Sequence, residues 1–203
     1  MDKKDFFNSM AAGWDEKFYS PELIRRLDEM VVSFGLSRGD CILDVGSGTG
    51  GLIPSILKVV GPSGEIQAID FAEEMVKRAT EKFESHKNIH IKCASVETLP
   101  FNDLFFDDVL CFGCFPHFDH KEKALNEMHR VLKQDGKLFI AHALSSKELK
   151  AHHQGAAPVA NDILPEEPEM KKMMAEAGFK NISIVDKAKC YICQGAKNLS
   201  NYQ

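Results

Sequence analysis

The chain has 203 residues, of which 44% are hydrophobic and 27% are charged, a composition typical of a globular protein with a sizeable core. Its formal net charge is −5 and it has no basic run, so nucleic acid is not the expected partner. No apolar run approaches the roughly 20 residues of a membrane-spanning helix, and the charged residues 1–5 lack the apolar centre of a signal peptide, so no membrane partner is expected.

In chain order, the apolar pattern predicts a helical cover and then alternating strands and helices. Residues 1–40 repeat apolar side chains on one helical face. Strands are expected at 41–45, 65–70, 89–93, 109–112 and 137–141. The helix after the fourth strand is expected to begin at Asp119, with Glu122 three residues later as in a capping box. Strands that alternate with helices favour an α/β fold with a mainly parallel sheet covered on both faces.

The rest of the chain is less regular. Residues 145–164 show no clear period, a helix is expected near 166–177, and two strand-like runs follow at 181–186 and 190–194. At this length we expect a single domain over residues 1–203. The six cysteines lie in apolar strand-like runs, which predicts buried thiols in a reducing cytoplasm.

The stretch that joins the first strand to its helix carries the strongest functional signal. Apolar Ile42, Leu43 and Val45 lead into a glycine run, and apolar residues resume at helical spacing after it. Glycines allow a sharp turn and let a ligand touch the backbone, and the free amides at the start of the next helix point towards that ligand. We therefore expect a nucleotide-binding α/β unit here.

Two cofactors fit this turn to different degrees. The spacing Gly46-x-Gly48-x-x-Gly51, with Asp70 at the end of the second strand, satisfies the dinucleotide fingerprint and would suit NAD. Asp44, however, places a carboxylate two residues before the first glycine, where it would repel a pyrophosphate. An acid there suits a cationic amine, and Asp70 suits a ribose diol, because a carboxylate accepts two hydrogen bonds. An amine and a ribose without phosphate describe S-adenosylmethionine.

Four segments carry motifs in a fixed order: Ile42-Leu43-Asp44-Val45-Gly46-Ser47-Gly48-Thr49-Gly50, Ala68-Ile69-Asp70-Phe71, Ser95-Val96-Glu97-Thr98-Leu99-Pro100-Phe101 and Phe106-Asp107-Asp108-Val109-Leu110-Cys111. This ordered set resembles the class I S-adenosylmethionine-dependent methyltransferases, nearest the small enzymes of the ubiquinone/menaquinone-biosynthesis-like group. The resemblance implies a three-layer Rossmann-like fold with a seven-stranded, mainly parallel sheet whose last strand is antiparallel. A helical cover (1–40), a cofactor-binding core (41–142) and a substrate-side segment with C-terminal strands (143–203) are then expected.

The resemblance also implies roles for individual residues. Asp70 is expected to bind the ribose and Phe71 to pack against adenine. Ser95 stands where the family usually has aspartate, so the adenine amino group is expected to meet Ser95 or the amide of Val96. The full set of expected cofactor-binding residues is Asp44, Gly46, Ser47, Gly48, Gly50, Asp70, Phe71, Ser95, Val96 and Cys111.

Histidines follow two strands of the predicted sheet. In parallel α/β sheets ligands bind beyond the carboxyl ends of the strands, so His117 and His142 are expected at one rim, where either could act as a general base. The alternative is a divalent metal held by His117, His142 and His153, which Asp162 could join. Ordinary packing is the plain alternative for any one of these residues.

Three further residues are candidates for the substrate pocket, namely Trp14, Cys114 and His153. The two C-x-x-C pairs, at 111–114 and 190–193, raise the question of structural zinc. Residues three apart on a strand point to opposite faces, so we expect buried thiols instead.

These observations predict transfer of a methyl group from S-adenosylmethionine to a small-molecule acceptor. The acceptor atom (oxygen, nitrogen, carbon, sulfur or a metalloid), the need for a base and the oligomeric state are left open. The alternatives are an NAD-binding oxidoreductase-like domain and a non-catalytic module that binds S-adenosylmethionine, and calorimetry with each cofactor would separate them.

Overall fold

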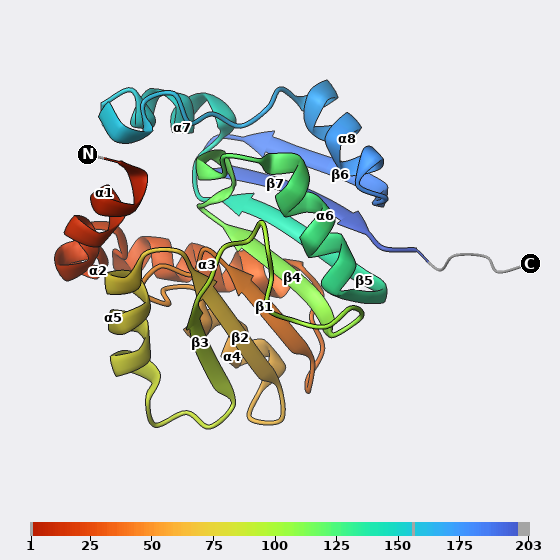
Figure 1. Ribbon diagram of the computed structural model, residues 1–203, viewed down its shortest axis with the longest axis horizontal. Coiled ribbons are helices and arrows are strands. Elements are labelled where there is room, and N and C mark those ends of the chain that lie inside the picture. The colour runs from red at the N-terminus through yellow and green to blue at the C-terminus, as the bar shows by residue number, and fades with distance from the viewer. Residues whose placement is uncertain (1, 156, 199–203) are drawn as a thin grey trace, which may run out of the picture.

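The computed structural model describes residues 2–155 and 157–198, within which seven strands form one sheet in the order β3-β2-β1-β4-β5-β7-β6 (Figure 1). The strands are β1 (Cys41–Val45), β2 (Glu65–Asp70), β3 (Ile89–Cys93), β4 (Phe106–Phe112), β5 (Leu132–His142), β6 (Lys180–Lys187) and β7 (Cys190–Ala196). Neighbours from β3 to β5 pair in parallel, and β7 runs antiparallel to both β5 and β6. The predicted sheet with an antiparallel last strand is confirmed.

Helices cover both faces of the sheet, because its central strands are apolar on both sides. Ile42 of β1 shares a core cluster with α3 (Pro21–Ser33) and α4 (Ile53–Val60), whereas Leu43 shares one with α6 (Lys121–Val131) and α8 (Glu167–Glu176). The helix α5 (Glu73–Phe83) lies against β2 and β3. Alternation along the strand thus produces the expected three layers.

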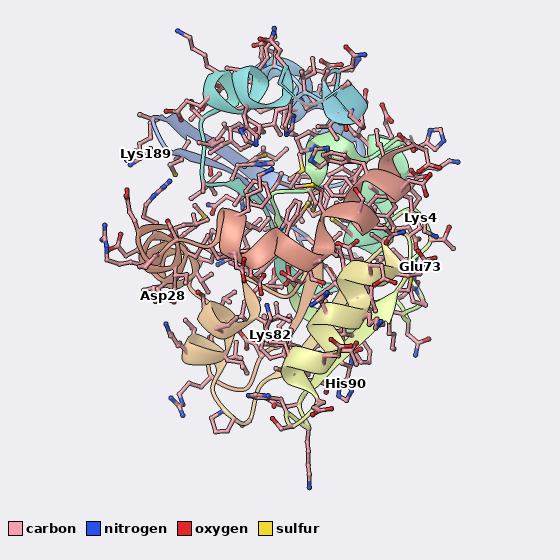
Figure 2. All side chains as sticks on the ribbon, turned by 90° about the vertical axis from the view of Figure 1, so that its left-hand side faces the viewer. Lys4, Asp28, Glu73, Lys82, His90 and Lys189 are labelled. Carbon is pink, nitrogen blue, oxygen red and sulfur yellow. The ribbon has the colours of Figure 1, made fainter. Side chains whose placement is uncertain are left out.

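The N-terminal residues form the expected helical cover, which consists of α1 (Lys3–Met10), the short turn η1 (Ala11–Gly13), α2 (Trp14–Phe18) and α3. The first of these helices is fastened to the start of α5. Lys4 pairs with Glu73, and the Asn8 side chain accepts a hydrogen bond of 3.0 Å from the amide of Glu74 (Figure 2). These contacts place the cover beside the carboxyl end of β2, which α5 follows.

The segment after β5, for which the sequence shows no period, contains α7 (Ser146–His153) and the short turn η3 (Ala157–Val159). A capping box starts α7. The hydroxyl of Ser145 accepts a hydrogen bond of 3.2 Å from the Glu148 amide, and the Glu148 carboxylate accepts one of 2.8 Å from the Ser145 amide. Only Leu149 and His153 are buried in this helix, too few to produce an apolar period.

The capping box expected at Asp119 is wrong. The helix α6 begins at Lys121, and its N-cap residue His120 makes no side-chain cap. Asp119 instead pairs with Lys3 across the molecule, with 2.8 Å between Nζ and Oδ1. Asp119, predicted as a helix N-cap, therefore links the N-terminal cover to the turn before α6.

Two strands begin earlier than the apolar pattern predicts, β4 at Phe106 and β5 at Leu132. Polar residues 133–136 interrupt the apolar run of β5, so only its second half was recognisable. The pairing of β4 with β5 is correspondingly irregular between Phe106 and Asp108. Among the described residues, no helix has the length and hydrophobicity needed to cross a bilayer.

Candidate active site

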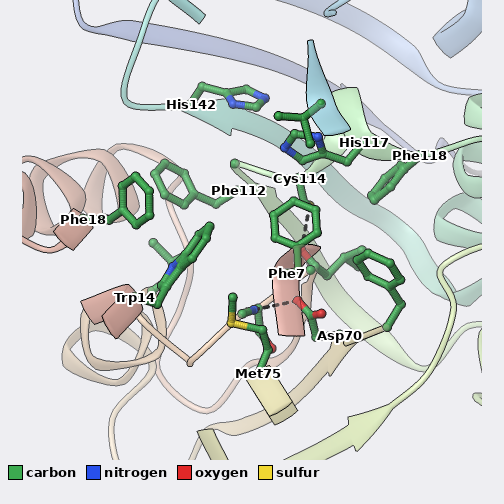
Figure 3. A pocket seen from close by; sticks show the side chains of 18 of the residues that line it. Phe7, Trp14, Phe18, Asp70, Met75, Phe112, Cys114, His117, Phe118 and His142 are labelled. Carbon is green, nitrogen blue, oxygen red and sulfur yellow. Dashed lines mark hydrogen bonds between the residues drawn. The ribbon is translucent and has the colours of Figure 1, made fainter. Parts of the chain in front are cut away.

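A cavity of about 670 Å³ lies at the carboxyl ends of β1, β2, β4 and β5, between the N-terminal cover and the segment after β5 (Figure 3). Most of the predicted site residues line it: Trp14, Asp44, Gly46, Ser47, Gly48, Asp70, Phe71, Ser95, Val96, Cys114, His117, His142 and His153. The fold thus gathers residues predicted for cofactor and for substrate around one space, as the strand-end rule requires.

Gly50 and Cys111 are the predicted cofactor residues that do not line the cavity. A Cβ at Gly50 would lie 2.6 Å from the Phe83 ring, so this glycine serves the packing of the turn against α5. Cys111 is fully buried, and its neighbour Phe112 lines the cavity in its place, because successive strand residues point to opposite faces. Their predicted roles in cofactor binding are therefore not supported.

The glycine turn is shaped by two close approaches. Gly46 has a φ of +64°, and a Cβ there would lie 2.5 Å from the Cβ of Cys114. Gly51 has no space for a side chain either, because the ring of Tyr19 comes within 1.9 Å of where its Cβ would be. The turn therefore packs closely against Cys114 and against the N-terminal cover, and both positions require glycine.

Asp44, the penultimate residue of β1, lines the cavity and has a carboxyl oxygen without a partner in the described chain. Its side chain is 1% exposed and Oδ2 has no hydrogen-bond partner. Burial, with a smaller contribution from the charge of Asp70, raises the pKa of Asp44 to about 8. Ionisation of such a carboxyl group is costly unless a cation or a hydrogen-bond donor lies against it.

Asp70 ends the adjacent strand β2 and faces the same space. Its two carboxylate oxygens accept hydrogen bonds from the amides of Gly48 (2.8 Å) and Ala72 (2.9 Å). Burial raises the pKa of Asp70, although these two amides act in the opposite direction. Phe71 follows with 36% of its surface exposed, so an acid and an exposed aromatic ring stand side by side at this end of the cavity.

The N-terminal cover closes the cavity over the glycine turn. Asp15 accepts a hydrogen bond from the hydroxyl of Thr49, and the ring of Trp14 packs on Phe18 at 4.4 Å between centroids. Burial, reinforced by the charges of Asp44 and Asp15, raises the pKa of Tyr19. Trp14 lines the cavity, as expected for a pocket residue, and also packs against the small core cluster of Ala11, Ala72 and Met75.

The opposite end of the cavity holds the histidines. Nδ1 of His117 lies 2.8 Å from Oδ2 of Asp162, and Nδ1 of His153 bonds to the backbone carbonyl of the same residue. The two imidazole rings are 4.9 Å apart. Lys3 of α1 donates a hydrogen bond to the carbonyl of His117 (3.1 Å) and pairs with Oδ1 of Asp162 (3.1 Å).

His142 lines the same end but in a different environment. It is 2% exposed, and its Nε2 is buried without a hydrogen-bond partner. Burial, helped by nearby His117 and His153, lowers the pKa of His142 to about 3. An imidazole that resists protonation to this extent is a poor general base near neutral pH, so this predicted role of His142 is not supported.

The described residues contain no group of three histidine, cysteine, aspartate or glutamate side chains placed to hold a metal ion, so the predicted metal site is not supported.

The cysteines also differ from expectation. Gly113 turns the chain with a φ of +72°, which brings Sγ of Cys114 within 3.2 Å of Sγ of Cys111. All six thiols are free, and Cys93 is exposed rather than buried.

Sequence reasoning missed several residues of the cavity. Phe7 is central to it, with ring centroids 5.8 Å from Phe71 and 5.1 Å from His117 (Figure 3). Tyr19 and Phe112 also line it. In a sequence, an aromatic residue of a helical cover cannot be told from an ordinary core residue. Only for Phe112 was there a signal, because the alternation of side chains along a strand places it on the face opposite to that of Cys111.

Comparisons with known proteins agree with this geometry. A family model described as a methyltransferase domain matches residues 43–140. The ubiquinone/menaquinone biosynthesis C-methyltransferase UbiE of Yersinia pestis bv. Antiqua (strain Antiqua) is 30% identical over 175 residues, which cover 73% of this chain and 70% of that protein. UbiE of Yersinia pseudotuberculosis serotype O:1b matches to the same extent.

Solved structures show the same relationship. An S-adenosylmethionine-dependent methyltransferase from Aquifex aeolicus is 26% identical with a TM-score of 0.70, and the match covers 87% of this chain and 98% of that chain. A Haloferax volcanii methyltransferase, solved in complex with the Trm112 methyltransferase activator, is 18% identical with a TM-score of 0.78, covering 98% and 99% of the two chains. The latter likeness shows a shared fold.

Proposed function

Since this chain belongs to the S-adenosylmethionine-dependent methyltransferases, we propose that it methylates a small, largely apolar acceptor that must lose a proton. The observation that carries the proposal is a single cavity with two unlike ends. One end has buried carboxyl groups and the other has aromatic rings and histidines. The first suits a cationic nucleoside and the second an apolar acceptor.

The residues present at the acidic end fit the cofactor. The unpartnered Oδ2 of Asp44 would hold its ammonium group, and the carboxylate of Asp70 would hold its ribose hydroxyl groups. Phe71 would pack against its adenine ring. When bound, S-adenosylmethionine supplies an activated methyl group, so the chain mainly has to align the acceptor and remove its proton.

The acceptor end is lined by aromatic and aliphatic side chains, namely Phe6, Phe7, Phe18, Phe112, Phe118, Leu144, Leu149 and Val159. Three basic side chains line the cavity, Lys3, Lys17 and Arg26, and Nζ of Lys17 lies over the ring of Phe18, 5.1 Å from its centroid. Arg26 donates to the carbonyl of Ala143 (2.6 Å), and Lys3 pairs with Asp119 and Asp162. These contacts favour an uncharged acceptor over a carboxylate or a phosphate.

His117 is the proposed base. It is 12% exposed in its side chain, lines the cavity and has Nδ1 engaged by a carboxylate, which leaves Nε2 as its second nitrogen. Removal of a proton by a positioned histidine contributes about 10²–10⁴-fold to rate. His117→Ala is therefore expected to lower kcat by about 10²-fold or more while leaving the affinity for S-adenosylmethionine nearly unchanged.

Two measurements test the proposal. Calorimetry with S-adenosylmethionine and with NAD separates the cofactors, and binding of NAD alone would contradict it. Turnover is then sought with phenols, quinols and thiols, beginning with ring acceptors because the cavity is aromatic and the UbiE relatives are C-methyltransferases of quinone biosynthesis. Tight binding of S-adenosylmethionine without turnover of any acceptor would favour the non-catalytic module.

Metal analysis of the purified protein decides between a base and a metal ligand. Metal-binding histidines commonly donate their other ring nitrogen to a carboxylate or a carbonyl group, and His117 and His153 both have Asp162 as such a partner. The described donors do not converge on one point, which favours the base. One equivalent of zinc, iron or nickel retained after dialysis would contradict that assignment.

A further inference from the structure

Asp162 joins three separate parts of the chain at the acceptor end of the cavity. It follows η3, is 9% exposed, and its Oδ2 lies 2.8 Å from Nδ1 of His117 after β4. Its Oδ1 lies 3.1 Å from Nζ of Lys3 in α1, and its backbone carbonyl bonds to Nδ1 of His153 in α7. One residue thus engages both imidazoles and the N-terminal cover.

The charge state of Asp162 determines where the proton of His117 lies. Burial acts to raise the pKa of Asp162, but hydrogen bonds from His117 and Lys3 outweigh it and hold the pKa below its usual value. An ionised carboxylate can only accept hydrogen bonds. Nδ1 of neutral His117 must therefore carry the proton, and Nε2 must carry the free lone pair.

We propose that Asp162 is a positioning residue that fixes His117 in the tautomer whose Nε2 accepts the proton of the methyl acceptor, and that Lys3 completes this unit from the N-terminal cover. The inference rests on the proposed function. As the acceptor atom bonds to the methyl carbon, its bond to hydrogen breaks and Nε2 takes the proton. The electron pair of the broken carbon–sulfur bond goes to sulfur and neutralises its positive charge.

The test reads the tautomer directly, without turnover. NMR of the full chain labelled with ¹⁵N-histidine is expected to show His117 protonated at Nδ1 and unprotonated at Nε2 in the wild type. In Asp162→Asn, which has nearly the same shape, both tautomers are expected to be populated. A wild-type spectrum with the proton on Nε2 would overturn the proposal even if no variant could be purified.

Kinetics separate positioning from a merely structural role once an acceptor is known. Asp162→Asn is expected to lower kcat by about 10²-fold, the lower part of the range for a positioned base, with KM and the affinity for S-adenosylmethionine changed less than about twofold. Asp162→Glu, which keeps the carboxylate, is expected to recover part of kcat. An equal loss in Glu and Asn variants would contradict a positioning carboxylate.

Asp119→Asn is the matched control. Asp119 also pairs with Lys3, at 2.8 Å, but its side chain is 73% exposed and it makes no hydrogen bond with His117. The His117 tautomer and kcat are both expected to match the wild type in this variant. If the wild-type protein did not bind S-adenosylmethionine, the proposed function would be wrong. The tautomer of His117 could still be measured, and it would still decide the role of Asp162.

Discussion

At the scale of single residues, the cavity contains one buried carboxyl oxygen without a partner among the described residues, on Asp44, beside Asp70, whose two carboxylate oxygens both accept hydrogen bonds. Asp44 is the penultimate residue of β1 and Asp70 the last residue of the parallel strand β2, and burial raises the pKa of both. A buried carboxyl group without a partner costs stability, and proteins retain such groups mainly at functional sites. The proposed binding of a cationic amine at Asp44 would account for this cost.

Asp44→Asn is expected to stabilise the ligand-free protein at alkaline pH. The folded pKa of about 8 lies above the value of about 4 for an exposed aspartate. The folded state thus binds the proton more tightly, and stability falls as pH rises from about 4 to about 8. The variant lacks this loss, so its Tm should exceed that of the wild type at pH 8.5 by at least about 3 °C.

The same variant measured at pH 4.5 provides the control, because there the wild-type carboxyl group is still protonated in the folded state and the Tm difference should nearly vanish. A Tm difference of equal size at both pH values would mean that the effect does not come from ionisation of Asp44.

Binding of S-adenosylmethionine at pH 7 is expected to release close to one proton. Asp44 is largely protonated in the ligand-free cavity at this pH, and an ammonium group requires the ionised form. Calorimetry in phosphate and in Tris should give binding enthalpies that differ by about the difference in buffer ionisation. Asp44→Asn should remove that difference and weaken binding by at least about 10-fold, corresponding to the loss of a charged hydrogen bond.

At the scale of elements, the contact between the N-terminal cover and the glycine turn is the most easily disturbed. A Cβ at Gly51 would lie 1.9 Å from the ring of Tyr19 and 2.2 Å from its hydroxyl oxygen. Gly51→Ala is expected to displace the ring and to destabilise the protein by about 1–3 kcal/mol, the usual cost of overpacking. Urea unfolding measures the change.

A second substitution identifies the cause of that loss. Tyr19→Ala opens the space, so adding Gly51→Ala to it should cost much less than adding Gly51→Ala to the wild type, and the two effects should not add. Gly13→Ala is the control glycine of the cover, because nothing lies within 4 Å of its Cβ position and it should be nearly neutral. Strict additivity would show that the Tyr19 ring is not the cause.

How far the sequence predicts the elements depends on how local their determinants are. The bounds of β1, β2 and β3 match expectation, because short apolar runs between turns define buried strands. The segment 145–164 was not predictable, because α7 buries only two residues. Asp119 resembled a helix cap but pairs with Lys3, a contact between residues 116 positions apart that no local pattern encodes.

The residues of the site also differ in whether a local sequence pattern predicts them. Asp44, Gly46 and Asp70 follow from the spacing of one turn and the ends of two strands, and they line the cavity. Cys111 is buried and does not line the cavity, whereas the next residue of the strand, Phe112, does. The partnership of His117 with Asp162 spans 45 residues and depends on a segment without periodicity, so its geometry had to come from the tertiary structure.

At the scale of the whole molecule, the cavity lies between the N-terminal cover and the segment that joins β5 to α8. Residues of the N-terminal cover, of the segment after β5 and of the strand ends line this cavity. The covering helices are short and fastened partly by exposed ion pairs such as Lys4 with Glu73, which contribute little stability. Opening of the site is therefore expected to involve the cover.

Hydrogen exchange tests this expectation. Saturating S-adenosylmethionine is expected to slow exchange of amides in α1 and α2 at least about 10-fold, because ligand binding favours the closed state, while amides of β1 and β4 keep their rates until global unfolding. Mass spectrometry of peptides from residues 3–19 and 106–112 makes the comparison. Equal slowing in both would indicate global stabilisation without a separate opening of the cover.

The exposure of Cys93 gives a practical route to watching this enzyme. Cys111, Cys114 and Cys193 are buried, whereas Cys93 is exposed and its Sγ lies 3.7 Å from the carbonyl of Phe71, a residue that lines the cavity. Burial and nearby Glu73 raise the pKa of the Cys93 thiol, so conjugation to a maleimide dye calls for mildly alkaline buffer. With adenine packed on Phe71 as proposed, a fluorophore attached there would lie beside the entering nucleoside and report its arrival and departure in real time.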